Sequence, residues 1–211
     1  MRRLEDKPEI SIIIPTYNHA HFLKRCLESV IAQTFINWEV IVVNNYSEDN
    51  TIEVVNSFAD PRVHLVNFHN NGIIAASRNE GIRQSSGNLI AFLDSDDWWY
   101  PNKLEIAAKY LTNTDIVYHD LDIFTNKGKR LIKRIRSAHL KKPVFIDLMK
   151  NSNVLANSSV VVRKSIIDKV GGLTEDKRFF AAEDFDLWLK ISRVTDRFLY
   201  IPKSLGAYWI G

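Results

Sequence analysis

Three carboxylates lie close together near the middle of the chain, in Asp94-Ser95-Asp96-Asp97, directly after an apolar run at 88–93. Carboxylates crowded in this way repel one another unless a positive charge lies between them. Mg²⁺ or Mn²⁺ supplies that charge and takes oxygen ligands, usually one or two carboxylates together with the phosphates of a substrate. The pattern therefore suggests a metal site, although acid pairs at strand ends are also common as helix caps and turns.

A second source of positive charge is needed if the protein handles a nucleotide diphosphate. The first apolar run, at 10–14, is followed by neither of the glycine-rich phosphate loops typical of dehydrogenases and P-loop enzymes, which makes those classes unlikely. Metal plus arginine is the usual substitute, and Arg78 is the candidate arginine. The competing interpretation of Arg78 is a surface helix residue paired with an acid.

Two more acids, Glu183 and Asp184, open an amphipathic segment at 183–193. Carboxylates in the first turn of a helix are favoured by the positive end of its dipole, so helix capping explains this pair as well as function does. Position along the chain alone leaves both interpretations open.

The elements that must position these residues follow from periodicity. Short apolar runs are predicted to be strands and segments with apolar residues three and four apart are predicted to be helices. The strands are expected at 10–14, 39–43, 63–66, 88–93, 115–124, 130–136 and 158–163, and the helices at 22–31, 73–84, 101–111 and 183–193.

This alternation predicts an α/β fold. The expected architecture is a Rossmann-like, mainly parallel central sheet with helices on both faces. A small hairpin region is expected after about residue 114, where the alternation changes and the strand at 130–136 is predicted to pair with the strand at 115–124. We expect one domain over 1–211, with a nucleotide-binding half at about 8–113 and an acceptor-side half at about 114–211.

The candidate residues should meet at one edge of that sheet. Ligands of open α/β sheets bind beyond the carboxyl ends of the strands, where the loops and helix N-termini gather. The segments that follow the first, second and fourth strands are 15–18, 44–49 and 94–99. They carry hydrogen-bonding groups and carboxylates that we expect to face one crevice.

Composition narrows the class of protein. The 211 residues are 45% hydrophobic and 25% charged, which is typical of a folded soluble domain. Cys26 is the one cysteine and cannot form an internal disulfide. No apolar run approaches the roughly 18 residues of a membrane span, and we expect a cytoplasmic protein.

The net charge is +3, but the excess of basic residues is concentrated in one stretch of the chain. Residues 127–142 hold eight lysines and arginines and no acid. Such a stretch attracts an anionic membrane surface, a phosphorylated acceptor or nucleic acid, or is a solvated hairpin without a partner. We expect peripheral contact with an anionic membrane at the inner face of the cell, and we rank nucleic acid last because no DNA- or RNA-reading motif accompanies the stretch.

Six short strings in this order resemble the inverting glycosyltransferases of family 2. They are Pro15-Thr16-Tyr17-Asn18, residues 26–34, Asn71-Gly72 with residues 76–81, residues 92–97, Val170-Gly171-Gly172 and residues 183–188. The resemblance extends from about residue 10 to residue 208.

That resemblance implies a GT-A fold, a nucleotide-diphosphate sugar donor, expected to be a UDP-sugar, and transfer to an acceptor hydroxyl with inversion. It also implies roles for individual residues. Asp184 would be the general base and Asp96 the ligand of Mn²⁺ or Mg²⁺; Pro15, Tyr17, Asn18, Asn44, Arg78, Asp94 and Ser95 would bind the nucleotide sugar; and Trp98, Trp99 and Glu183 would lie on the acceptor side. The acceptor would be an oligosaccharide or lipid-linked, in polysaccharide or glycolipid biosynthesis.

The chain departs from the family pattern in two places. Asn44, Asn45 and Tyr46 stand where two aspartates and a glycine are usual. An asparagine offers both a donor and an acceptor, so a preference for uridine is open to question. The chain also ends at Gly211, where the family often has a histidine and further acceptor-side structure. A non-catalytic nucleotide-sugar or glycan-binding module is therefore the alternative function.

Overall fold

The computed structural model describes residues 7–125 and 130–211. Its first half repeats a strand and a helix, with β1 (Ile10–Thr16), α1 (Ala20–Ile31), β2 (Trp38–Asn44), α2 (Thr51–Ser57), β3 (Val63–Asn67), α3 (Ile74–Gln84), β4 (Leu89–Phe92), β5 (Trp98–Trp99) and α4 (Lys103–Leu111). Every residue of β1, β2 and β4 is buried. Strands buried on both faces have continuous apolar sequences, which is why these three were predictable.

The second half mixes hairpin and helix. It contains β6 (Ile116–Thr125), β7 (Arg130–Ile135), α5 (Val144–Asn151), the short 3-10 helix η2 (Asn157–Ser159), β8 (Val161–Arg163), α6 (Lys164–Val170), the 3-10 helix η3 (Lys177–Phe179), α7 (Glu183–Ser192) and β9 (Phe198–Ile210). Among the described residues, no helix has the length and apolar character needed to cross a membrane.

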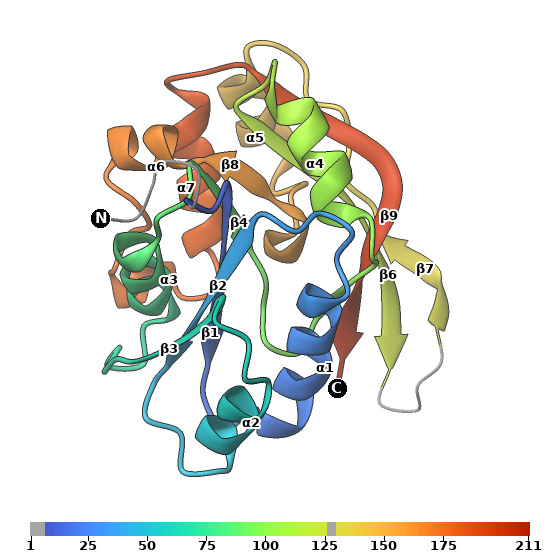
Figure 1. Ribbon diagram of the computed structural model, residues 1–211. Coiled ribbons are helices and arrows are strands. Elements are labelled where there is room, and N and C mark those ends of the chain that lie inside the picture. The colour runs from blue at the N-terminus through green and yellow to red at the C-terminus, as the bar shows by residue number, and fades with distance from the viewer. Residues whose placement is uncertain (1–6, 126–129) are drawn as a thin grey trace.

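One sheet runs through both halves, in the order β3-β2-β1-β4-β8-β6-β9-β5, with β7 paired to β6 (Figure 1). Strands β1 to β4 are parallel to one another, as predicted. Beyond β4 the pairing is mixed, because β8 lies antiparallel between β4 and β6 while β9 runs parallel to β6. The predicted hairpin of β6 and β7 is confirmed.

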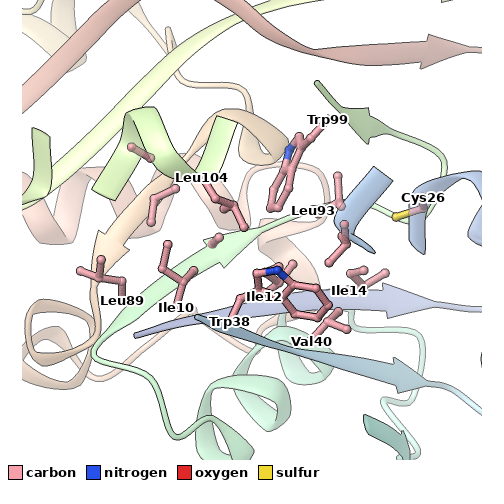
Figure 2. Packing of buried hydrophobic residues seen from close by; sticks show 14 of the residues in the cluster. Ile10, Ile12, Ile14, Cys26, Trp38, Val40, Leu89, Leu93, Trp99 and Leu104 are labelled. Carbon is pink, nitrogen blue, oxygen red and sulfur yellow. The ribbon is translucent and has the colours of Figure 1, made fainter. Parts of the chain in front are cut away.

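The core has two layers, one on each face of the sheet, because alternate strand residues point to opposite sides. Ile10, Ile12 and Ile14 pack with Trp38 against α1 and α4 (Figure 2). Ile13 points the other way, into a layer formed with α3 and α7. The sheet is thus covered on both faces, and its carboxyl edge is left to the loops.

The remaining elements were not predicted from periodicity. Helices α2, α5 and α6 are seven or eight residues long, too short to display a clear 3.6-residue repeat. Strand β5 has two residues. The long β9 contains Pro202 and Gly206, which normally interrupt strands, and its register shifts twice along β6.

Candidate active site

The loops that follow β1 and β2 are joined by backbone and side-chain hydrogen bonds. The Asn18 amide N–H donates to Ser47 Oγ at 2.9 Å, and the Glu48 N–H donates to Asn18 Oδ1 at 2.8 Å. Asn18 has a φ of 53°, in the left-handed region that asparagine tolerates better than most residues. These contacts join the two loops into a rim at the carboxyl edge of the sheet.

Asn44 lies beneath that rim and is fully buried. Its Nδ2 donates to Asn67 Oδ1 at 2.8 Å, and its Oδ1 accepts from the N–H and the hydroxyl of Ser47 at 3.0 and 2.6 Å. Both polar atoms of the side chain are thus engaged within the protein. The Asn44 side chain is therefore packed beneath the rim, where it has no exposed surface for the direct donor contact that we expected.

Two tyrosines at the same rim are exposed. The Tyr17 residue is 52% exposed and the Tyr46 residue is 50% exposed. The Tyr46 ring stacks on the His69 ring, with centroids 3.9 Å apart. Pro15 and Ser95 are buried, and Ser95 Oγ lies 2.9 Å from Nδ1 of His19 at the start of α1. Flat aromatic faces are therefore available beside the rim.

Arg78 joins the two acidic segments. Its Nη2 donates to Asp94 Oδ1 at 2.8 Å and its Nη1 donates to Glu183 Oε1 at 2.7 Å. The arginine side chain is only 4% exposed. Burial by itself would lower the pKa of Arg78, but the charges and hydrogen bonds of Asp94 and Glu183 raise it. Arg78 is thus an internal cation that bridges residues 16 and 105 positions away.

Both ends of this bridge carry further contacts. Asp94 Oδ1 also accepts from Asn157 Nδ2 at 3.1 Å, and the Asp94 N–H donates to Ser158 Oγ. Glu183 Oε2 is buried and has no hydrogen-bond partner within the described chain. Because Glu183 is paired with Arg78, its position at the start of α7 is explained by an ion pair, which the helix-capping interpretation did not anticipate.

Asp96 is half-buried, and its main-chain oxygen accepts from Arg25 Nη2 at 2.8 Å. Burial and the neighbouring Asp94 raise the pKa of the Asp96 carboxyl. Asp97 is buried more deeply, and its Oδ1 accepts from the Trp209 N–H at 2.9 Å. Burial raises the pKa of Asp97 well above its usual value, with Asp94 adding to the effect. The three acids therefore accumulate negative potential, as their spacing predicted.

Asp184 lies beside Glu183 at the start of α7. Its Oδ1 accepts from the Phe185 N–H at 2.6 Å, and its Oδ2 accepts from Asn153 Nδ2 at 3.2 Å. Burial raises the pKa of Asp184, and the positive charge of Arg78 opposes part of that rise. The carboxylate is thus oriented by two donors and holds a proton more readily than a solvated aspartate.

The pKa of the Tyr208 phenol, on β9, is affected by carboxylates of both acidic segments. Burial raises the pKa of Tyr208, and the charges of Asp97, Asp94, Asp96 and Asp184 raise it further. One half-buried side chain thus lies within electrostatic reach of Asp96 and of Asp184. The Arg78 bridge likewise connects the two acidic segments, although Asp97 and Asp184 are 87 positions apart in the chain.

The two tryptophans differ in position. Trp99 is 2% exposed, and its Nε1 donates to the Ser158 main-chain oxygen at 2.7 Å. It therefore belongs to the core, contrary to the expectation that it lies on the acceptor side. Trp98 is half-buried, with the Arg25 guanidinium 3.7 Å above its ring and Phe124 beside it.

Sequence reasoning missed three polar residues of the candidate site. Asn153, Asn157 and Ser158 lie in the segment between α5 and β8 and contact Asp184 or Asp94. Asn153 and Asn157 lie outside every predicted element, and Ser158, predicted to begin the strand at 158–163, lies instead in η2, because β8 begins only at Val161. The preference of asparagine and serine for loops was the only available hint.

Comparison with known proteins identifies glycosyltransferases that are similar in sequence to this chain. Residues 11–171 match the model of the family described as glycosyl transferase family 2. The Escherichia coli protein described as UDP-Glc:alpha-D-GlcNAc-diphosphoundecaprenol beta-1,3-glucosyltransferase WfgD is 32% identical over 184 residues, covering 86% of this chain and 69% of that protein. The chain spans 60% to 69% of the length of three of the curated relatives that it matches.

Solved structures agree in fold. The Staphylococcus aureus TarS 1–349 complex with UDP superposes with a TM-score of 0.78 at 20% identity, covering 96% of this chain and 60% of TarS. The mannosyltransferase PcManGT from Pyrobaculum calidifontis, solved with GDP-Man and Mn²⁺, superposes with a TM-score of 0.71 at 20% identity, covering 96% and 57%. The fold expected from the motif resemblance, GT-A, is thereby confirmed.

Proposed function

Because the chain belongs to glycosyl transferase family 2, we propose that it moves a sugar from a nucleotide-diphosphate donor, a UDP-sugar by family resemblance, to an acceptor hydroxyl, with inversion at the anomeric carbon. The observation that carries this proposal is the Arg78 bridge, which joins Asp94 of the first acidic segment to Glu183, the neighbour of Asp184. On this proposal, an acid suited to the donor and an acid suited to the acceptor would lie on the two sides of one site.

The donor side of the cleft would be the rim and the Asp94 loop. Tyr17 offers a flat exposed face for a nucleobase, while Pro15, Asn18 and Asn44 shape the rim from below. Asp94 would accept from a ribose or sugar hydroxyl through its partly exposed carboxylate, which is 27% exposed. Arg78 would act mainly by holding Asp94, because its guanidinium is buried. Ser95, bonded to His19, would fix the loop.

Asp96 suits a divalent cation held largely by the substrate. Within residues 7–125 and 130–211, no three His, Cys, Asp or Glu side chains are grouped to hold a metal by themselves. No described side chain donates to the Asp96 carboxylate, and its pKa is raised by burial and then by the charge of Asp94, a charge that a cation would offset. Mn²⁺ or Mg²⁺ there would neutralise charge on the departing diphosphate. The Mn²⁺ complex of PcManGT supports this choice of ion.

Asp184 is the proposed general base. The acceptor oxygen would form its bond to the anomeric carbon while its proton passes to the Asp184 carboxylate, and the nucleoside diphosphate would leave with the bonding electrons. A base works best when its pKa is not far below the working pH, and burial moves Asp184 in that direction. Asn153 and the Phe185 N–H would keep its carboxylate oriented.

Release of nucleoside diphosphate from a nucleotide sugar tests the proposal. We expect release by the wild type only with Mn²⁺ or Mg²⁺, and at least a hundredfold less by Asp96→Ala and Asp184→Asn. Asp168→Asn, an exposed change on α6, is the matched control and should keep full activity. Equal release by the two site variants would refute the assigned roles.

The nucleobase and the alternative function are tested together by ligand-dependent melting. We expect UDP, among UDP, GDP, dTDP and CDP, to raise the melting temperature most, and Mn²⁺ to increase the effect. The alternative, a non-catalytic nucleotide-sugar or glycan-binding module, is suggested by Asn44 and Asn45 in place of the usual acids. Stabilisation by a nucleotide without turnover of any donor would favour that alternative.

A lipid-linked acceptor and contact with an anionic membrane complete the proposal. The acceptor named in the description of WfgD is of this kind. Of the basic stretch 127–142, residues 127–129 lie outside the described residues. Arg136, Lys141 and Lys142 are exposed, whereas Arg134 is paired with Asp122 at 2.9 Å.

Liposome sedimentation tests the membrane contact. We expect the wild type to sediment with vesicles that contain phosphatidylglycerol, and a variant with Arg136, Lys141 and Lys142 changed to Glu to remain in the supernatant. Changing three exposed lysines elsewhere to Glu, at positions 109, 169 and 203, is the charge-matched control. Equal loss in the control would indicate a general charge effect, and no loss in the test variant would leave the stretch a solvated hairpin.

A further inference from the structure

A pocket of about 290 Å³ opens between the start of α3 and the loop that leads into α7. Its apolar lining includes Ile73, Ile74, Phe179 and Phe180, and Glu183 also lines it. Small-molecule sites range from roughly 300 to 1,000 Å³, so this pocket is at the lower end. Its size suits one ring of a ligand better than a whole nucleotide sugar.

Phe180 is the most exposed large apolar side chain that lines this pocket, and the residue is 77% exposed. The loop that presents it is held at several points. Thr174 Oγ1 donates to Asp186 Oδ2 at 2.6 Å on α7, and the Leu173 N–H donates to Asn79 Oδ1 at 2.9 Å on α3. The ring is therefore presented from an anchored segment, with one face free for a partner.

Ala181, next to Phe180, has a φ of 60° in the left-handed backbone region. This conformation costs a residue other than glycine roughly 1–2 kcal/mol. Such strain persists where the surrounding structure imposes it, and it clusters at ligand sites. Here it turns the chain sharply between the exposed ring of Phe180 and the buried start of α7.

Glu183 supplies a polar group to the same pocket. Its side chain is 10% exposed, and its Oε1 is bonded to Arg78. Its Oε2 has no donor among the described residues. A buried acceptor left without a donor costs roughly 1–3 kcal/mol, and more when the group is charged. A hydroxyl of a ligand in the pocket that Glu183 lines would supply the donor that this oxygen lacks.

An apolar face beside hydrogen-bonding acceptors fits a pyranose, whose C–H faces are apolar and whose rim carries hydroxyl donors. We propose that this pocket binds a sugar ring of the acceptor. That the sugar belongs to the acceptor rests on the proposed function. The pocket is lined by Glu183, which is next to the proposed base Asp184, whereas Asp94 lies at the other end of the Arg78 bridge. A sugar of the donor is the competing source.

Saturation-transfer NMR with methyl glycosides tests the site without any donor. The probes are the methyl β-glycosides of glucose, galactose and N-acetylglucosamine. We expect transfer to ring protons of at least one probe with the wild type, a threefold to tenfold weaker affinity with Phe180→Ala, and little change with Phe180→Trp, which keeps a flat face. Tyr110→Ala removes an exposed aromatic on α4 and is the matched control. Because Phe180 is exposed, its removal should leave folding intact.

The possible outcomes distinguish an acceptor sugar from a donor sugar, and the sugar site from the proposed transferase function. Unchanged affinity of UDP and of the nucleotide sugar in Phe180→Ala, with weakened glycoside binding, supports the acceptor assignment. An equal loss of nucleotide-sugar affinity, with UDP affinity kept, would assign the pocket to the donor sugar and overturn it. No binding of any glycoside by the wild type, or equal binding by Phe180→Ala, also overturns it. If the wild type turns over no donor but binds a glycoside through Phe180, the proposed function fails while the sugar site remains.

Discussion

The buried bridge of Arg78 makes a strong quantitative prediction. In Arg78→Met the guanidinium is replaced by an apolar chain of similar length, and the carboxylates of Asp94 and Glu183 lose their shared cation. Removing one partner of a buried ion pair costs about 3–5 kcal/mol, because the remaining charge is left uncompensated. Glu183 is 10% exposed but Asp94 is 27% exposed, so water can screen Asp94 and the loss should lie near the lower figure.

The measurement is chemical denaturation, supported by thermal unfolding. A loss of about 3 kcal/mol in a chain of this size corresponds to a fall in melting temperature of roughly 6–12 °C. Arg78→Lys should lose less, because one ammonium can still pair with one of the two acids but cannot bridge both as the planar guanidinium does. The triple variant Arg78→Met/Asp94→Asn/Glu183→Gln has no unpaired charge and should recover most of the loss.

Two results would refute this reasoning. If Arg78→Met lost less than about 1 kcal/mol, the pairs would be behaving as exposed salt bridges do. If the triple variant were as unstable as Arg78→Met, packing and not uncompensated charge would account for the loss. Activity is a separate readout, since all three variants disturb the proposed donor side.

Three further predictions concern buried groups. Burial lowers the pKa of Lys103 well below 10.5 in the folded protein, so the unfolded chain binds more protons between that lowered pKa and 10.5, and stability should rise with pH across this interval. Lys103→Met should flatten this rise and stabilise the protein by about 1–3 kcal/mol at neutral pH, measured from urea unfolding midpoints. Burial instead raises the pKa of Asp97 well above 3.8, so between 3.8 and that raised pKa the folded protein binds more protons than the unfolded chain, and its stability should fall as pH rises. Asp97→Asn keeps an acceptor for the Trp209 N–H and should remove that fall. A variant whose stability has the same pH profile as the wild type would contradict the assignment. A Cβ at Gly81 would lie 2.5 Å from Ile13 Cγ2, so Gly81→Ala should cost about 1–3 kcal/mol despite its better helix propensity, and a double-mutant cycle with Ile13→Ala should show relief of most of that cost.

Particular residues show which features of the fold and the candidate site could be predicted from the sequence. The apolar runs of β1 and β4 and the acids after β4 were predictable, because a strand buried on both faces needs consecutive apolar residues. Asn44 and Trp99 were not, since nothing local distinguishes a rim residue from one packed beneath it. Asn44 is engaged by Asn67 on the neighbouring strand, and Trp99 by Ser158, 59 residues away.

The sequence by itself determined which side chains with useful chemistry exist, the alternation of strand and helix, and the family resemblance, because these depend on residue type and short spacing. Only the tertiary structure decided that Arg78 is an internal bridge between Asp94 and Glu183, and that Phe180 stands uncovered near Glu183 at the same pocket. The physical reason is distance along the chain. Contacts between residues about a hundred positions apart arise from the packing of the whole sheet and its two helical layers, and no local pattern records them.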